Sequence, residues 1–250
     1  MASDNAALTV KGVYAGYNRV KVLHGVNLRL ERGEIGVLLG TNGNGKTTLL
    51  RCLSGLLQPD SGEITLSVNG PVNIVGKKAY ELVAEGVSLI PEGRLLFASL
   101  TVEENLVMGA FSKLARKKVK ENMKEVYAIF PLLEERKHQL ASTMSGGQQQ
   151  MLAIGRGLMS NPKLLMIDEP SLGLAPILVA KVMAAIKELR DKFGVTVLMA
   201  EQNFFQASRI ADRGFVMTHG KIVSEAVGDE LRDAEFVKSH YLSKGTLKTS

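Results

Sequence analysis

The stretch GTNGNGKT at residues 40–47 carries the strongest chemical signal in the chain, because it matches the pattern G-x-x-x-x-G-K-[ST]. Glycines let the backbone turn its N–H groups inward around an anion, and a helix that starts here adds the positive end of its dipole. Lys46 is expected to reach the β- and γ-phosphates of a nucleotide, and the Thr47 hydroxyl to reach a Mg²⁺ ion. A glycine-rich turn without a ligand is the alternative. The residues expected to surround the phosphates are Gly40, Thr41, Asn42, Gly43, Asn44, Gly45, Lys46, Thr47 and Thr48.

Two acidic residues, Asp168 and Glu169, follow the apolar run LLMI at 164–167. A strand here would deliver both carboxylates to the carboxyl edge of a sheet, where a phosphate loop also sits. Asp168 would hold Mg²⁺ directly or through water, and Glu169 would act as the general base that activates a water molecule. The alternative is that Asp-Glu-Pro forms an exposed turn with no chemical role.

The segment MSGGQQQ at 144–150 opens a helical pattern and suggests a second anion site. Ser145 is a good N-cap residue, but two glycines in the first turn weaken a helix and are unexpected for capping alone. Together with the N–H groups of Gly146 and Gly147, its hydroxyl would form another anion-binding helix start. One chain would then carry two half-sites for phosphate.

The elements that must position these residues alternate between short apolar runs and longer amphipathic segments. Because several apolar runs are almost continuously hydrophobic, we expect an α/β fold with a largely parallel central sheet. The interval 93–160 breaks the alternation and predicts an inserted helical subdomain. Strands are expected at 8–15, 34–39, 63–68, 86–91, 163–168, 196–201 and 213–218, and helices at 45–56, 77–85, 101–109, 116–129, 145–160, 176–192, 203–211 and 230–242.

The composition of the 250 residues, 45% of them hydrophobic, is that of a soluble globular protein with one core or one core and an appended subdomain. The net charge of +6 is modest and does not argue for nucleic acid. The basic run at 113–120 is interpreted as a solvated helix face, with contact to anionic lipid or to a membrane partner as the alternative. No apolar run is long enough to span a membrane, and the first residues do not form a secretory signal. The single cysteine, Cys52, excludes an internal disulfide and is expected to be an inert core residue.

The phosphate loop, MSGGQ and LLMIDEP in this order and spacing resemble the nucleotide-binding subunit of an ABC transporter, from Tyr14 to about His240. The resemblance implies a P-loop NTPase core with antiparallel strands near the N-terminus. It also implies one domain over 1–250, with a catalytic core at 1–92 and 161–250 and a helical signature subdomain at 93–160. In this family two cassettes dimerise head to tail, so that the signature of one closes over the ATP on the phosphate loop of the other.

Further residues take roles only through this resemblance. Ser145, Gly146, Gly147 and Gln148 would be the signature that contacts the ATP of the partner cassette. Tyr17, 23 residues before Gly40, matches the aromatic that stacks on adenine; the alternative is a strand tyrosine on the core face.

The segment SLGLAP at 171–176 resembles the D-loop that crosses the dimer interface, but Ala175 stands where many members have an acid. An interface contact made by that acid is therefore not assumed for this chain.

Two departures from the family pattern concern hydrolysis. Glu92 stands where a glutamine is expected, and Gln202 where a histidine is expected. Glu92 keeps an oxygen that can reach Mg²⁺ or its water, while Gln202 keeps a neutral donor for the γ-phosphate or the attacking water. Because Lys46, Asp168 and Glu169 are present, we expect an active ATPase with Glu169, Gln202 and Lys46 as catalytic residues and Thr47, Asp168 and Glu92 around Mg²⁺.

The combination of PEGR, EPSLGLAP and EQN resembles the ATPases of LivF type from branched-chain amino acid importers. This implies an ATP- and Mg²⁺-dependent subunit on the cytoplasmic face of the plasma membrane. Its partners would be a second cassette, different or identical, two permeases and, indirectly, a solute-binding protein. The segment 94–100 offers apolar side chains for a permease groove, or for ordinary packing. The alternatives are another ABC importer, a lipopolysaccharide or lipid exporter, and a non-transport ABC ATPase.

Overall fold

The computed structural model of the chain describes residues 5–232, and two β-sheets organise it. The central sheet has six strands in the order β10-β9-β3-β8-β7-β6, all parallel except β10. Every residue of β3, β7 and β8 is buried, as expected for strands covered on both faces. The strands are β3 (Ile35–Leu39), β6 (Val87–Ile90), β7 (Leu164–Asp168), β8 (Thr196–Glu201), β9 (Arg213–Thr218) and β10 (Lys221–Val227).

The second sheet is antiparallel and has the order β2-β1-β4-β5, which confirms the antiparallel strands expected near the N-terminus. Its strands are β1 (Ala6–Tyr17), β2 (Val20–Glu31), β4 (Ser61–Leu66) and β5 (Val72–Asn73). The sequence does not predict β2, β5 and β10. Much of β2 and β10 alternates between buried and exposed residues, so these strands lack the nearly continuous apolar run that marks β3, β7 and β8 in the sequence.

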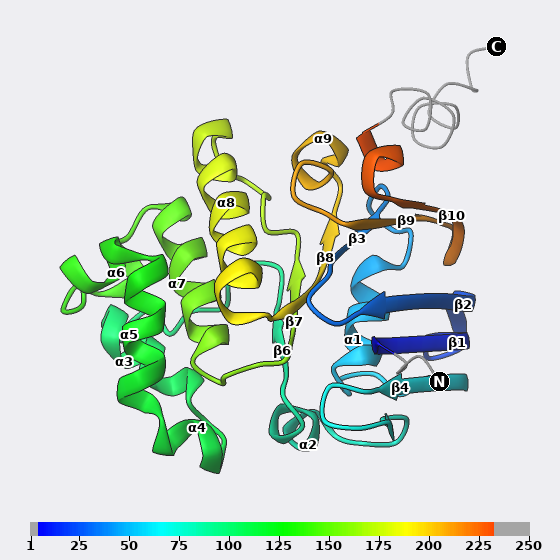
Figure 1. Cartoon of the computed structure of the whole chain (residues 1–250), viewed down its shortest axis with the longest axis horizontal. Coiled ribbons are helices and arrows are strands. Elements are labelled where there is room, and N and C mark those ends of the chain that lie inside the picture. The colour runs from blue at the N-terminus through cyan, green and yellow to red at the C-terminus, as the bar shows by residue number, and fades with distance from the viewer. Residues whose placement is uncertain (1–4, 233–250) are drawn as a thin grey trace.

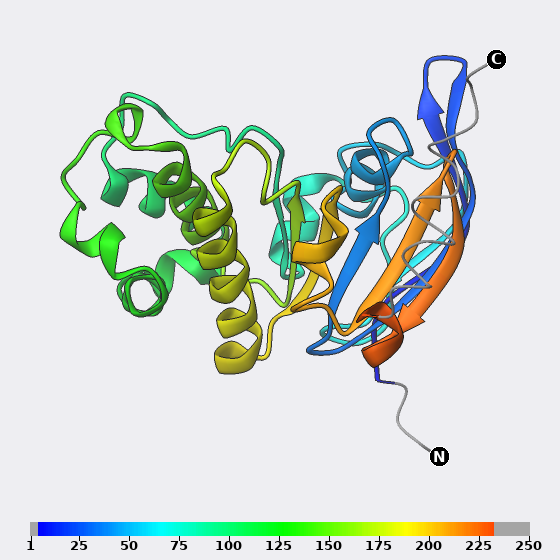
Figure 2. The same cartoon turned by 90° about the horizontal axis from the view of Figure 1, so that it is seen from above.

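Helix α1 (Lys46–Leu53) lies between the two sheets and contacts both, which fixes the direction in which the phosphate loop points. Figure 2 shows the resulting arrangement, with the antiparallel sheet on one side of the central sheet and helices on the other. One hydrophobic cluster fills the space around α1, and a second joins the other face of the central sheet to α8 (Pro176–Phe193) and to the helices of 102–158.

The interval 93–160 is helical in the structure and holds no strand, apart from a single bridge between Thr101 and Leu140. The expected helix 116–129 is wrong as one element: it is interrupted at Lys118, where φ is −112° and ψ is 15°. Because this interval shares its hydrophobic cluster with the central sheet, boundaries at 93 and 160 remain a prediction. Its elements are α3 (Val102–Gly109), α4 (Lys113–Lys117), α5 (Val119–Ile129), α6 (Pro131–Glu135), η1 (Ala141–Thr143) and α7 (Gly146–Leu158).

Other helices differ from expectation mainly at their ends. Helix α2 (Ala79–Ala84) is shorter than the predicted 77–85, and α9 (Phe204–Ala207) is a single turn within the predicted 203–211. The predicted helix 230–242 falls mostly outside the described residues, whose last element is η2 (Gly228–Arg232). Within residues 5–232, no helix combines the length and the apolar character that crossing a membrane requires.

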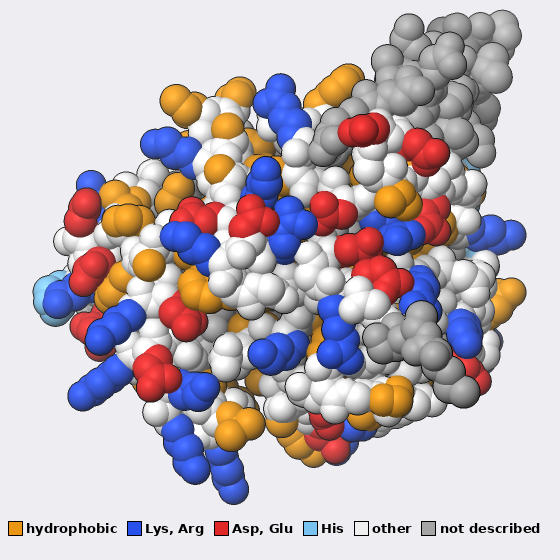
Figure 3. All heavy atoms as spheres, viewed as in Figure 1, with side chains coloured by type: hydrophobic (Ala, Val, Ile, Leu, Met, Phe, Trp, Pro, Cys, Tyr) orange, Lys and Arg blue, Asp and Glu red, His pale blue; other side chains and the backbone are white. Residues whose placement is uncertain are grey.

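The basic run 113–120 lies on α4 and the start of α5, and all five of its lysine and arginine side chains are exposed. Figure 3 shows Lys and Arg side chains extending from this edge of the molecule. Cys52 is buried, and burial raises the pKa of its thiol to about 12, which agrees with an inert core residue.

Candidate nucleotide-binding and catalytic site

The phosphate loop connects β3 to α1, as the sequence predicted. Gly43 and Gly45 have φ of +84° and +96°, a region that side chains with a Cβ rarely adopt. Gly45 is the N-cap of α1 and no side chain caps this helix, so the N–H groups of its first turn point toward the loop without a side-chain acceptor. The loop therefore has the backbone conformation and the helix dipole that an anion requires.

Asn44 ties this loop to the turn between β9 and β10. Its side chain donates to Thr41 Oγ1 at 2.9 Å and accepts from the His219 N–H at 2.9 Å. Its carbonyl accepts from the Gly220 N–H at 3.1 Å, and the Gly220 carbonyl in turn accepts from the N–H of His24 in β2. No local sequence pattern indicates this connection, since Asn44 and His219 alone are 175 positions apart.

The two carboxylates lie beside the loop, because β8 alone separates β7 from β3. Lys46 Nζ is 3.0 Å from Glu169 Oε1 and donates to the Gly40 carbonyl at 2.7 Å. The Lys46 and Glu169 side chains are only 4% and 7% exposed. Asp168, Glu169 and Pro170 are all buried, so the interpretation of this tripeptide as an exposed turn is wrong.

Asp168 has the surroundings of a metal ligand. Burial is the largest influence on its carboxyl and raises the pKa; the Thr47 hydrogen bond opposes this, while the charges of Glu169 and Glu92 add to it. Its Oδ1 atom is buried and has no hydrogen-bond partner among the described residues. Within residues 5–232, no group of three or more His, Cys, Asp or Glu forms a protein-only metal cage. The hydroxyl and carboxylate oxygens of Thr47, Asp168 and Glu92 fit Mg²⁺, which takes few protein ligands and completes its shell with phosphate and water.

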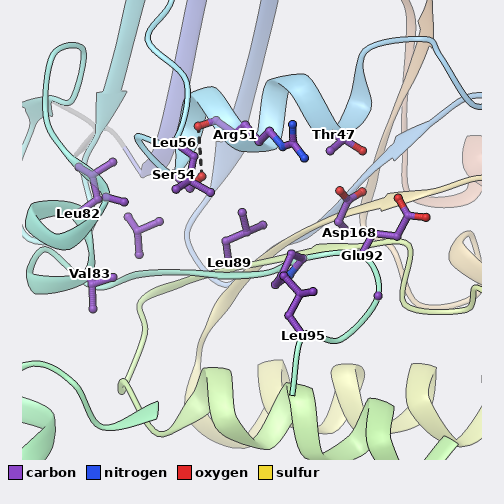
Figure 4. Close-up of a pocket in the computed structure, with 14 residues that line it drawn as sticks. Thr47, Arg51, Ser54, Leu56, Leu82, Val83, Leu89, Glu92, Leu95 and Asp168 are labelled. Atoms are coloured by element: carbon purple, nitrogen blue, oxygen red, sulfur yellow. Dashed lines mark hydrogen bonds between the residues drawn. The ribbon is translucent and has the colours of Figure 1, made fainter. Parts of the chain in front are cut away.

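Two adjoining cavities surround these groups. One, of about 440 Å³, is lined by 42–48 of the phosphate loop together with Val22, Glu92 and Glu169. The other, of about 630 Å³, shares Thr47 and Glu92 with it and extends between α1, α2 and β6. In Figure 4, Thr47, Asp168 and Glu92 lie at one end of this larger cavity and Leu82 and Val83 at the other. Glu92 therefore sits where the polar and apolar cavities meet.

Gln202 follows β8 directly and is exposed at the same carboxyl edge of the sheet as Glu169. The preceding residue, Glu201, was assigned no role from the sequence. It is 0% exposed, and its two oxygens accept hydrogen bonds from Ser171, Gln202 and Asn203. A glutamate directly after the apolar run 197–200 is the one sequence signal that would have identified it.

The signature residues lie apart from the phosphate cavity of their own chain, since none of them lines it. Ser145 caps α7 by accepting from the Gln148 N–H, while the Gln148 side chain accepts from the Ser145 N–H at 2.9 Å. A Cβ on Gly147 would lie 2.7 Å from Leu178 of α8, so packing explains this glycine. A Cβ on Gly146 would meet only the end of the Arg94 side chain, at 3.4 Å, so packing does not require a glycine here; Gly146 is half-buried and Ser145 is exposed.

Tyr17 ends β1 with its side chain 38% exposed, so it is not a core-face tyrosine. Its hydroxyl accepts from Arg51 of α1 at 3.1 Å, and the Arg51 guanidinium lies 5.9 Å from the ring centroid. Tyr17 is not among the residues that line the phosphate cavity, and its stacking on adenine stays a prediction.

Comparison with known proteins decides the family. The model of the ABC transporter family matches residues 23–172, from β2 through both carboxylates. The chain belongs to the ABC transporter family. It is 45% identical over 226 residues to the high-affinity branched-chain amino acid transport ATP-binding protein BraG of Pseudomonas aeruginosa, an alignment that covers 90% of this chain and 95% of that protein.

Two further similarities agree with this membership. The probable branched-chain amino acid transport ATP-binding protein LivF of Archaeoglobus fulgidus is 33% identical over 227 residues, covering 91% of this chain and 94% of that one. A dimeric ATP-binding cassette solved in a post-hydrolysis state with ADP and phosphate superposes with a TM-score of 0.75 at 25% identity, covering 88% and 98%. The chain is thus an ABC ATPase with the expected α/β fold, and the predicted resemblance to the LivF type is confirmed.

Proposed function

We propose that this protein is the ATP-hydrolysing subunit of an importer for branched-chain amino acids. The observation that carries the proposal is the convergence of Lys46, Thr47, Asp168 and Glu169, from the start of α1 and the end of β7, at two adjoining cavities that share Thr47. The solute class is supported by the names of the two relatives, which cover nine-tenths of the chain. Its place is the cytoplasmic face of the membrane, where ATP is available.

The residues divide the work of hydrolysis among them. The loop N–H groups and Lys46 hold the phosphates, and Thr47, Asp168 and Glu92 hold Mg²⁺, which neutralises charge on the phosphates. Glu169 accepts a proton from the attacking water, and Gln202 donates a hydrogen bond to the γ-phosphate or to that water. Because Gln202 is neutral, it orients without supplying a proton. Tyr17 stacks on the adenine base.

A second cassette completes the site. Ser145, Gly146, Gly147 and Gln148 lie away from the phosphate cavity of their own chain, and the similar cassette with ADP and phosphate is a dimer. The signature of one cassette therefore closes over the ATP held by the other, and hydrolysis loosens the pair. The resemblance to the LivF type implies that the second cassette is a different protein. The proposed dimer is therefore a heterodimer.

The larger cavity offers a place for the permeases. Leu82, Val83 and Leu95 line its apolar part, whereas Glu92 and Asp168 belong to the chemical site. Leu95 and Phe97 are 65% and 45% exposed, so the segment 94–100 does not merely pack inside the helical region. A permease segment bound here would lie against Glu92, so a movement of Glu92 at the nucleotide site would reach the permease. Two permeases and a solute-binding protein complete the proposed system.

The decisive experiment uses the hydrolysis-blocked variant Glu169→Gln. With ATP and Mg²⁺ it is expected to pair with itself or with its companion cassette in size-exclusion chromatography, and the pairs should disperse when ATP is removed. Glu63→Gln, a change of the same type on the exposed face of β4, is the control and should hydrolyse ATP like wild type. Failure of ATP to produce pairs would overturn the sandwich of two cassettes.

The importer assignment needs a separate measurement. Affinity purification from membranes is expected to recover two permeases, and crosslinking should add a solute-binding protein that binds leucine, isoleucine or valine. Recovery of exporter permeases instead would leave the ATPase assignment intact but contradict the importer.

A further inference from the structure

Glu201 is a buried carboxylate that joins the loop after β7 to the loop after β8, at the carboxyl edge of the central sheet. Oε1 accepts from the Ser171 N–H at 2.9 Å, and Oε2 accepts from the Ser171 hydroxyl at 2.9 Å. Oε2 also accepts from the N–H groups of Gln202 at 3.2 Å and Asn203 at 3.4 Å. The side chain is 0% exposed, so these protein donors replace the water that an exposed carboxylate would bind.

The two loops that meet at Glu201 each carry a residue of the hydrolytic site. Ser171 is two positions beyond Glu169, and Gln202 is the residue next to Glu201. The β7 and β8 strands that precede them are paired, with Asp168 opposite Ala200. Beyond that pair the ladder ends, and the Glu201 side chain continues the connection between the two segments.

The backbone of Glu169 needs such support. Its φ is +50°, in the left-handed region that residues other than glycine adopt only at a free-energy cost. The Glu169 N–H donates to the Ala200 carbonyl at 2.9 Å, and its carbonyl accepts from Leu172 at 3.1 Å. The two bonds from Ser171 to Glu201 hold the next turn of the same segment, so the strained conformation is fixed from both ends.

Only a carboxylate can make all of these contacts from this position. An ionised carboxylate has two oxygens and no donor, so it accepts from both loops at once. A glutamine has one accepting oxygen, and its amide group would oppose either the Ser171 N–H or the donors of Gln202 and Asn203. This set of hydrogen bonds therefore requires an ionised carboxylate, and a neutral side chain of the same volume does not suffice.

We propose that Glu201 is a positioning residue that fixes Glu169 and Gln202 relative to each other at the carboxyl edge of the sheet, where β7 and β8 end side by side; this rests on the proposed ATPase function. The side chain contacts no reacting atom. It holds the backbone beside the general base and the backbone of the glutamine that orients the water. Loss of its contacts displaces both groups, while the phosphate loop keeps its conformation, because the hydrogen bonds of the Glu201 side chain go to Ser171, Gln202 and Asn203 and not to residues 40–48.

The test compares Glu201→Gln with wild type in steady-state ATP hydrolysis. We expect kcat to fall by about 10- to 100-fold, because small displacements of catalytic groups have effects of that size, while KM and ATP affinity change by less than about threefold. The matched control is Asp212→Asn. Asp212 also accepts a backbone N–H, that of Ile35 at 2.9 Å, and an Arg190 bond at 2.8 Å, but at the opposite edge of the sheet. That variant should melt at a lower temperature with kcat unchanged.

A double-variant cycle separates positioning from general stability. Gln202→Ala should lower kcat in the wild-type background and much less in Glu201→Gln, since the glutamine is already displaced there. Ser171→Ala removes only the hydroxyl contact and should lower kcat by a smaller factor, with the melting temperature nearly unchanged. If Glu201→Gln does not fold, Ser171→Ala and its cycle with Gln202→Ala decide the question in the same way.

Three results would count against the proposal. If Glu201→Gln and an active wild type have the same kcat, the positioning role of Glu201 is wrong, and the ATPase assignment is unaffected. A parallel fall of kcat and melting temperature in both Glu201→Gln and Asp212→Asn, with additive effects in the cycle, would reduce Glu201 to a structural role. A wild-type protein that hydrolyses no ATP, alone or with its companion cassette, would remove the proposed function and this inference with it.

Discussion

Lys46 and Glu169 form an ion pair, with 3.0 Å between Nζ and Oε1, at the point where the phosphate loop and the second carboxylate strand meet. Both side chains are almost fully buried, so each neutralises a charge that water does not reach. We expect the phosphates of a nucleotide in the neighbouring cavity to compete with Glu169 for this lysine. Nucleotide binding would then release the carboxylate that is proposed to act as base.

The first prediction concerns Glu169→Gln. Removal of the general base should lower kcat by about 10²- to 10⁴-fold. Because the amide no longer holds the Lys46 ammonium, ATP affinity should stay the same or rise by a few-fold. Turnover and the binding of a fluorescent ATP analogue would measure the two effects. A variant that turns over at the wild-type rate would remove the assigned base, whereas weaker ATP binding would contradict the competition for Lys46.

The second prediction concerns the other partner. Lys46→Met should abolish tight ATP binding and also destabilise the fold by about 3–5 kcal/mol, because it leaves the Glu169 carboxylate buried without its cation. Adding Glu169→Gln should restore most of the lost stability without restoring ATP binding. Thermal unfolding of the three variants without nucleotide checks this. Equal melting temperatures for the single and double variants would show that the ion pair does not govern stability.

Much of this site could be predicted from the sequence, because its signals are local. The phosphate loop follows an apolar strand and precedes a helix, and Asp168 and Glu169 end another apolar strand. Parallel strands bring their carboxyl ends to one edge, so the meeting of these groups followed from the fold class. The contact of Glu92 with this edge agreed with the family resemblance.

What the sequence could not predict depends on contacts between distant loops. Nothing in the local pattern indicates that Glu201 bonds to Ser171, 30 positions away, or that Asn44 bonds to His219. These contacts follow from the strand order, which places β7 beside β8 and β9 beside β3. The interruption at Lys118 was missed for another reason: its neighbours on both sides have helical patterns.

The third prediction uses the raised pKa of Asp168. Burial, the largest cause, means that the folded protein holds this proton more tightly than the unfolded chain. Protonated Asp168 therefore adds to the free energy of unfolding at acidic pH. This stabilisation is lost as pH rises through the raised pKa, so ionised Asp168 destabilises the folded protein near neutral pH. Without Mg²⁺, Asp168→Asn should therefore melt at a higher temperature than wild type at pH 7.5, and the difference should shrink toward pH 4.

Magnesium reverses this difference. With ATP, Mg²⁺ should stabilise wild type and have little effect on Asp168→Asn, which should also lose most of its turnover. Chelation by EDTA should return wild type to its lower melting temperature. A difference between the two proteins that does not vary with pH, or equal stabilisation of both by Mg²⁺ with ATP, would contradict the role of Asp168.

The fourth prediction concerns Asn44, which joins the phosphate loop to the turn after β9. Asn44→Ala removes the side-chain bonds to Thr41 and His219 and leaves the loop glycines in place. Loss of this preorganisation should raise the Kd for ATP by about 3- to 10-fold with a smaller effect on kcat, since each bond contributes about 1 kcal/mol. Asn69→Ala, which removes a surface bond to the Glu85 carbonyl, is the control and should bind ATP like wild type. An unchanged Kd for Asn44→Ala would show that the loop holds its shape without this side chain.

The fifth prediction concerns Gln202, which stands where many relatives are expected to have histidine. Gln202→Ala should lower ATP turnover in the assembled transporter by about tenfold or more, because alanine cannot donate the proposed hydrogen bond to phosphate or water. Gln202→His should retain substantial turnover and gain a dependence on pH near the imidazole pKa, which wild type lacks at this position. The rates must be compared at equal ATP occupancy, so KM is measured for each variant. Unchanged turnover in Gln202→Ala would mean that this residue does not sense the γ-phosphate and that Glu169 orients the water alone.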